Sequence, residues 1–309
     1  MCDTTWIQSV FLDAPNLTIK TTKKHLATFG LLFGATSWGI IWYPYRLLEQ
    51  AGISGVASSF YTYCIAVILG ALLFARHWRG LVILPKAVIL LGLAAGWTNL
   101  SYVLAVIDGE VMRVMLLFYL SPLWTVVLAH FWLHERAGWL GAITIAISLI
   151  GAFIMLWQPD VGLPLPQSNA EWMALSSGIG FALTNVLTRR ASHLSLQAKS
   201  MAVWVGVVVM ALVFIPFQSV SLSMPDSITT AQWLMMAGIG LLLMCATLLV
   251  QYGITHTPVT RASVIFLFEL VVAAVTSYWL AGEAMNAREW IGGSLIIAAA
   301  IIATHTEKT

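Results

Sequence analysis

Long apolar stretches alternate with short polar ones along almost the whole chain. Ten stretches are long enough to cross the roughly 30 Å hydrocarbon core of a bilayer, which takes about 20 mainly apolar residues per helix. They lie at residues 26–46, 55–75, 83–105, 111–133, 138–157, 171–189, 198–217, 231–253, 258–281 and 288–304. The longest loop, 158–170, contains three prolines that oppose helix. The pattern predicts an all-α polytopic membrane protein with ten transmembrane helices, five on each side of this loop.

Composition agrees with a membrane location. Only 9% of the residues are charged, whereas soluble domains average about 25%. The net charge of +2, with no basic stripe outside short loops, argues against a nucleic-acid partner. The three cysteines, Cys2, Cys64 and Cys245, are scattered and show neither a disulfide framework nor metal-ligand spacing. We therefore expect no metal and no cofactor, and partners limited to membrane lipid and a small-molecule solute.

Lysine and arginine set the expected orientation, because cytoplasmic loops are enriched in them. With both termini inside, 12 of the 15 lie in cytoplasmic segments or adjoining helix ends, and only Arg46, Arg113 and Arg288 lie outside. We expect a multi-pass protein of the cell inner membrane. Residues 1–25 and 305–309 are its expected cytoplasmic tails, and 158–170 its extracytoplasmic linker.

The two halves of the chain resemble each other when the first is shifted by 148 positions. The matched pairs are Gly92 and Gly240, Leu93 and Leu241, Leu100 and Leu248, Arg113 and Arg261, Phe118 and Phe266, and Glu135 and Glu283. Because five spans precede the second half, it enters the membrane from the opposite side. The sequence predicts two inverted five-helix repeats, 26–157 and 171–304. Secondary transporters commonly use this plan, with the substrate near the midplane where the halves meet.

Two segments carry a family resemblance. The first is YLSPLWTVVLAHFWLHERAGWLGAITIAISLIG, from Tyr119, and the second is FLFELVVAAVTSYWLAGEAMNAREWIGGSLIIAAAII, from Phe266. The first resembles the Leu-x-Pro, apolar stretch, Glu and Gly pattern of the drug/metabolite transporter superfamily, specifically ten-helix permeases of two EamA-type repeats. The second is similar to the corresponding Leu-Glu-Pro pattern, with Leu270 where the family has proline. The resemblance implies a transporter, with export of amino acids or other metabolites favoured.

Glu269 is the only acidic residue in the middle of a span; the other twelve lie in tails, loops or helix ends. A charged side chain there costs at least a few kcal/mol, so intramembrane acids usually have a function. Glu269 is expected either to face a cavity, where it binds an amine or carries a coupling proton, or to be a protonated acid that ties two helices together. Its equivalent in the first half is Ser121, so any role is asymmetric.

Other polar and aromatic residues are candidates for the wall of a substrate cavity. An aromatic wall suits an amphipathic solute through stacking and cation–π contacts, although a single tryptophan or tyrosine more often serves packing or interface anchoring. Buried amides need a partner, which can be a solute or another helix. Pro122 is expected to bend its helix. The candidates, besides Glu269 and Ser121, are Trp38, Tyr43, Trp97, Asn99, Tyr102, Tyr119, Asn185, Gln251 and Tyr252.

A membrane-embedded enzyme acting on a lipid or lipid-linked substrate is the alternative interpretation. The sequence has no HExxH zinc motif, paired-aspartate motif, P-loop or nucleophile elbow. A single mid-membrane acid, without a mid-span histidine or lysine, is a poor basis for acid–base catalysis. Without an ATP site, we expect a non-enzymatic, gradient-driven or facilitated transporter that works by alternating access.

Overall fold

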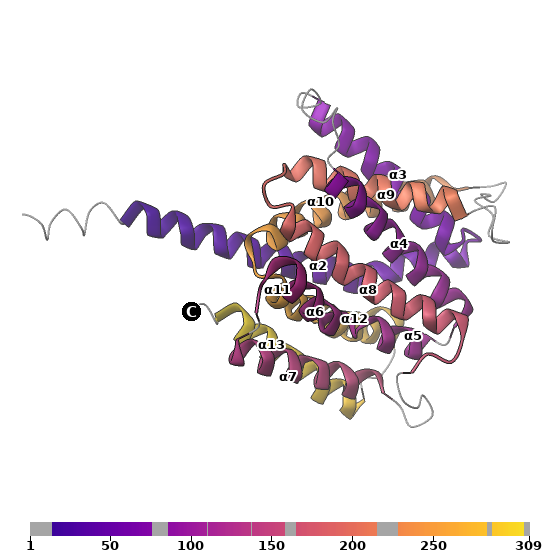
Figure 1. Ribbon diagram of the computed structural model, residues 1–309. Helices are drawn as coiled ribbons and strands as arrows, with labels where there is room; N and C mark the ends of the chain where they lie inside the picture. The colour runs from indigo at the N-terminus through magenta and orange to yellow at the C-terminus, as the bar shows by residue number, and fades with distance from the viewer. Residues whose placement is uncertain are drawn as a thin grey trace, which may run out of the picture.

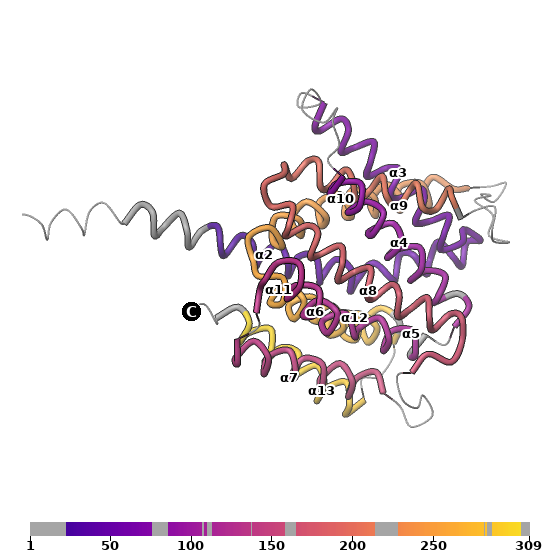
Figure 2. The backbone as a smooth tube through the Cα atoms, viewed as in Figure 1, coloured from indigo at the N-terminus to yellow at the C-terminus, as the bar shows by residue number. Residues whose placement is uncertain are grey.

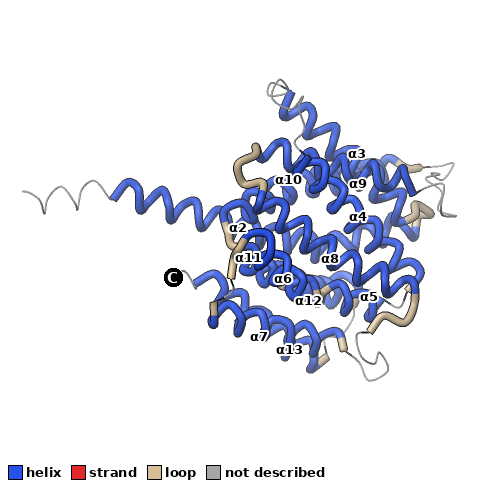
Figure 3. Tube along the Cα trace, in the orientation of Figure 1, coloured by secondary structure: helices blue, strands red, loops and turns tan. Residues whose placement is uncertain are grey.

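The computed structural model describes residues 14–75, 86–109, 111–136, 138–157, 165–214, 228–282 and 286–305. Within these ranges the chain consists of helices and short connections, without a strand (Figure 3). The helices are α2 (Ala14–Gln50), α3 (Gly55–Phe74), α4 (Lys86–Asp108), α5 (Val111–Phe118), α6 (Ser121–Leu133), α7 (Trp139–Leu156), α8 (Asn169–Arg190), α9 (Leu196–Phe214), α10 (Thr230–His256), α11 (Val259–Phe266), α12 (Phe268–Thr276), the π-helical η4 (Ser277–Ala281) and α13 (Ala287–His305).

These helices form ten spans, because α5 and α6 together make one span and α11, α12 and η4 make another. Within the described ranges, eight spans have the length and mean hydropathy needed to cross a membrane. The other two are α8 and α13. Polar side chains such as Glu171, Asn185 and Arg189 lower the hydropathy of α8, which lies inside the bundle (Figure 1). The predicted all-α polytopic fold with ten helices is confirmed.

The packing of the helices repeats between the two halves. Helix α4 packs on α8 as α10 packs on α2, α4 packs on α9 as α10 packs on α3, and α6 packs on α8 as α12 packs on α2. When each of spans one to five is matched with its counterpart among spans six to ten, the first pair of each comparison becomes the second. The same matching leaves the pairs α3–α9 and α7–α13 unchanged, because each of them joins a span to its own counterpart. The contacts therefore have the two-fold pattern expected of an inverted repeat.

All of these contacts join helices from different repeats, so the repeats interleave. The pair α7–α13 lies side by side at one edge of the bundle (Figure 2). It crosses at Gly151 and Gly292, where a Cβ on Gly151 would be 2.7 Å from the carbonyl oxygen of Gly292. Small residues let two helices approach this closely, which matches a supporting position away from the centre.

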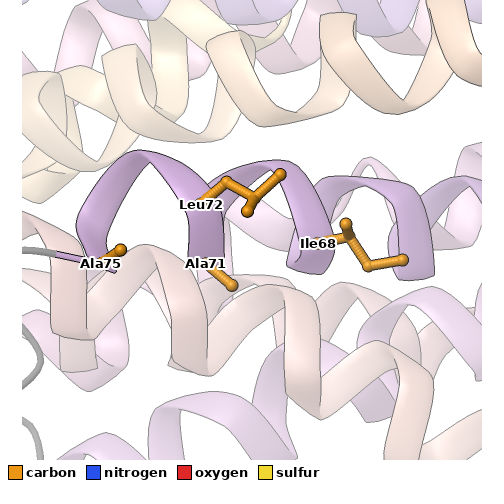
Figure 4. A pocket seen from close by; sticks show the side chains of 4 residues that line it. All are labelled: Ile68, Ala71, Leu72 and Ala75. Carbon is orange, nitrogen blue, oxygen red and sulfur yellow. The ribbon is translucent and has the colours of Figure 1, made fainter.

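A shallow hollow of about 360 Å³ lies on the outer face of α3, lined by Ile68, Ala71, Leu72 and Ala75 (Figure 4). The side chains of Ile68 and Leu72 are exposed. In a bilayer this face meets acyl chains, and its apolar lining suits them rather than a polar solute. We assign the hollow to lipid contact.

Packing on α10 can be tested with two glycines of the same helix. A Cβ on Gly240 would be 2.7 Å from Ile65 Cγ2, whereas Gly238 is exposed and has nothing within 4 Å of such an atom. We expect Gly240→Leu to lower stability by about 1–3 kcal/mol through overpacking, and Gly238→Leu to leave it unchanged or raise it. Thermal unfolding in detergent measures both. Equal effects of the two substitutions would contradict the packing of α10 on α3.

Candidate functional site

Two spans are interrupted near their middle at equivalent positions. Helix α5 ends at Phe118 and α11 ends at Phe266, which is 148 residues later. After each end the chain makes a turn before the next helix begins, at Ser121 and at Phe268. The fourth and ninth spans are thus both broken helices, a feature typical of binding sites in secondary transporters.

The two breaks have different local causes. In the first, Pro122 has no N–H with which to bond the carbonyl of Phe118. In the second, Leu270 stands in the place of proline, and its N–H bonds the carbonyl of Leu267 at 3.1 Å, three residues back instead of four. The departure of Leu270 from the family pattern therefore does not remove the break.

Glu269 follows the second break, in the first turn of α12, and is half-buried. The hydroxyl of Tyr119, which belongs to the first break, lies close enough to its carboxyl group to interact with it electrostatically. Tyr102 on α4 lies close enough to interact electrostatically with the same carboxyl group. The mid-span acid thus meets two of the predicted tyrosines, and it joins the two broken helices.

A line of aromatic rings crosses the bundle beside these breaks. Tyr102 contacts Phe118 with ring centroids 4.9 Å apart, and Phe118 contacts Phe181 of α8 at 5.7 Å. Phe181 contacts Phe266 at 5.4 Å, and Trp38 of α2 contacts Phe266 at 6.4 Å. The three phenylalanines were missed by sequence reasoning, since a phenylalanine in an apolar helix indicates packing. The signal available was that Phe118 and Phe266 match between the repeats.

The remaining predicted residues are more widely spread. Ser121 is buried at the start of α6, and Trp97 and Asn99 are half-buried on α4. Tyr43 packs against Trp42, and Tyr252 against His256, each on its own helix, and no described contact joins either tyrosine to Glu269. Asn185 and Gln251 are buried, and each has a side-chain polar atom without a hydrogen-bond partner among the described residues. The structure therefore gathers Glu269, Tyr119, Tyr102 and Trp38 but not the whole predicted set.

Two ion pairs hold the broken fourth span against α8. At one end, which we name the Arg113 end, Arg113 Nε lies 2.7 Å from Glu171 Oε1 and Nη2 lies 2.9 Å from Oε2. At the other, the Arg189 end, Arg189 Nε lies 3.0 Å from Glu135 Oε1. Sequence reasoning placed these residues in loops or at helix ends and predicted neither pair. Glu283, the sequence match of Glu135, lies outside the described residues.

Comparison with known proteins identifies this arrangement. The model of the EamA-like transporter family matches the chain twice, over residues 25–157 and 168–304. The chain belongs to the EamA-like transporter family. It is therefore a multi-pass membrane transporter with two EamA repeats, as the resemblance implied. The domain boundaries drawn from sequence stay a prediction.

Relatives of this EamA protein are themselves described only as transporters. An uncharacterized transporter of Archaeoglobus fulgidus is 26% identical over 222 residues, which cover 69% of this chain and 75% of that protein. An uncharacterized transporter of Pseudomonas aeruginosa is 26% identical over 201 residues, 61% of this chain and 63% of that protein. One crystal structure aligns with a TM-score of 0.74 at 17% identity, over 90% of this chain and 97% of the other, and shows the shared fold.

The ion pair at the Arg113 end predicts a stability effect. Arg113→Gln leaves the buried carboxylate of Glu171 without its partner, and we expect it to lower the free energy of unfolding by about 3 kcal/mol. The double variant Arg113→Gln, Glu171→Gln should recover a large part of the loss. The control is Arg288→Gln, an exposed arginine. Unfolding in detergent is the measurement, and a double variant as unstable as the single one would contradict a paired role.

Proposed function

We propose that this EamA protein is a secondary transporter that exports a small amphipathic metabolite, such as an amino acid, across the cell inner membrane by alternating access. The observation that carries the proposal is the position of Glu269. It is the one acid in the middle of a span, it follows the break of the ninth span, and it lies close to Tyr119 in the break of the fourth.

A carboxyl group in this place needs a compensating partner. Charge at the bilayer centre costs at least a few kcal/mol, and the nearby hydroxyls of Tyr102 and Tyr119 are neutral groups that do not balance a full charge. The amino group of a cargo molecule or a proton would complete the compensation. We assign Glu269 to one of these two tasks, the binding of an amine or the carriage of a coupling proton.

The rings beside Glu269 suit the rest of an amphipathic cargo. Phe118, Phe181, Phe266 and Trp38 present apolar faces and ring edges next to an acid and a tyrosine hydroxyl. An aliphatic or aromatic body can pack on such rings, and a cationic group can lie over a ring face. The ends of the half-helices at the breaks add polar groups beside the rings.

Flux into and out of liposomes tests the proposal directly. Purified protein is reconstituted and offered radiolabelled amino acids, amines and nucleosides, with and without a pH gradient. We expect flux of at least one class, and a response to the gradient if a proton is coupled. No flux of any solute, together with turnover of a lipid substrate, would favour the membrane-enzyme alternative.

Glu269→Gln keeps the size of the side chain but removes its charge. We expect the initial transport rate to fall by at least about tenfold, the effect of losing one hydrogen bond to a charged group, and its pH dependence to flatten. Tyr119→Phe should give a smaller loss, because the carboxyl group remains. The matched control is Glu49→Gln, an exposed acid at the end of α2. Transport by Glu269→Gln equal to wild type at every pH would exclude the assigned role.

A further inference from the structure

Lys199, in the first turn of α9, is a buried cation that the proposed role of Glu269 does not use. Its side chain is among the largest fully buried ones, with 1% of its surface exposed. Its Nζ donates to Thr255 Oγ1 of α10 at 2.5 Å. Arg189 of α8 donates to the backbone carbonyl of the same threonine. Two cations from different helices therefore converge on one residue at the Arg189 end.

The negative charge at this place does not balance the two cations. In the segments that meet here, 129–136, 185–200 and 251–262, Glu135 is the only acid in the sequence. Its Oε1 accepts from Arg189, and its Oε2 accepts from the backbone N–H of Val259 at the start of α11. Both carboxylate oxygens are thus engaged away from Lys199. Lys199, Arg189 and Glu135 together carry an excess of one positive charge; Arg136, Arg190 and Arg261 lie in the same segments but take no part in these hydrogen bonds.

Unpaired polar atoms lie within one helical turn of this cluster. They are Asn185 Nδ2, Thr188 Oγ1, Ser200 Oγ and Gln251 Oε1, all in side chains at most 3% exposed. Buried polar groups in native proteins are nearly all hydrogen-bonded, so several orphans together call for a missing partner. An amide nitrogen and two hydroxyls can donate, as can the two remaining N–H groups of Lys199. The set is rich in donors and suits a ligand rich in acceptors.

One face of α8 connects this cluster with the helix breaks. Phe181, Asn185 and Arg189 are spaced four residues apart and therefore lie on the same side of the helix. Phe181 contacts Phe118 and Phe266, the last residues before the two breaks. On this face Asn185 lies between Arg189 and Phe181, and therefore between the charged cluster and the rings beside Glu269.

We propose that Lys199, Arg189 and the orphan groups of Asn185, Thr188 and Ser200 form a binding site for a carboxylate, which receives the carboxylate group of the cargo at the Arg189 end. The ligand is a monoanion, because one negative charge balances the cluster and a phosphate dianion would exceed it. The identification of this carboxylate as part of the cargo rests on the proposed transport function. With the orientation expected from the sequence, the site lies on the cytoplasmic side, where an exported solute enters.

Acetate is the minimal probe of the site and needs no transport. Purified protein in detergent is unfolded thermally in sodium acetate, in sodium chloride of equal ionic strength, and with acetamide as the neutral isostere. We expect acetate to raise Tm in a saturable way and acetamide to leave it unchanged, because a ligand that binds only the folded state stabilises it. No acetate-specific rise in the wild type, or a larger rise with inorganic phosphate, overturns the proposal.

Substitutions at Lys199 locate the effect. Lys199→Gln should weaken acetate binding by at least about tenfold, Lys199→Arg should retain it, and Lys86→Gln, an exposed lysine at the start of α4, should behave like wild type. Without acetate, Lys199→Gln should unfold at or above the wild-type Tm, since it keeps a donor for Thr255 and removes the uncompensated charge. A lower Tm with unchanged acetate binding would show that Lys199 is only a structural tie.

Glu269→Gln separates this site from the transport proposal. It should lose transport and keep the acetate-dependent rise in Tm, because Glu269 lies at the breaks and not in the cluster. Acetate binding that depends on Lys199, in a protein that moves no solute, would remove the transport proposal and leave the binding site. Flux without such binding would do the reverse.

Discussion

Hydrocarbon offers no hydrogen-bond partner to a peptide group, so each backbone N–H and C=O inside a membrane must find its partner within the protein. Regular helices meet this requirement by themselves, and a break in a helix does not. Both breaks in this chain lie against other helices. The carbonyl of Phe118 is 2.7 Å from where a Cβ of Gly178 would be, and that of Glu269 is 2.8 Å from a Cβ of Gly39. Without a side chain at Gly178, α8 covers the open carbonyl of the first break, and α2 packs closely on the chain just after the second break.

The same close packing limits how the protein can move. The most extensive contacts all join helices of different repeats, so the first repeat cannot rock against the second as a separate body. The contacts instead divide the helices into an edge pair and a central group. Helices α7 and α13 pack mainly on each other at the edge, whereas α2, α4 and the broken fourth span lie around Glu269. The proposed alternating access would therefore require the helices beside the breaks to change their packing, and these helices come from both repeats.

The sequence predicts the features that depend on local patterns. The ten spans follow from apolar length, and Glu269 stands out because an acid in the middle of a span is rare. The partners of the acids were not predictable in this way. Glu171 is 58 residues from Arg113, and nothing in either helix end indicates that the two meet. The burial of Lys199 was hidden for a related reason, since a lysine in the first turn of a helix usually reaches water. The break before Leu270 has no proline to mark it in the sequence; it shows only in the structure, where the N–H of Leu270 bonds the carbonyl of Leu267.

The two ends of the contact between the fourth span and α8 differ in charge balance, and this difference suggests which end changes during transport. At the Arg113 end the arginine and Glu171 match one for one, and Glu171 also accepts from the backbone N–H of Gln167. A fully paired and buried contact has little to gain from a ligand and much to lose by opening. At the Arg189 end, Lys199 has no acid of its own, and the contacts that close this end converge on Thr255. An anion that binds there would compete for the donors of Lys199 and Arg189 and so weaken the same contacts. Binding of the anion would then itself open the contacts at the Arg189 end, while the ion pair at the Arg113 end stays closed.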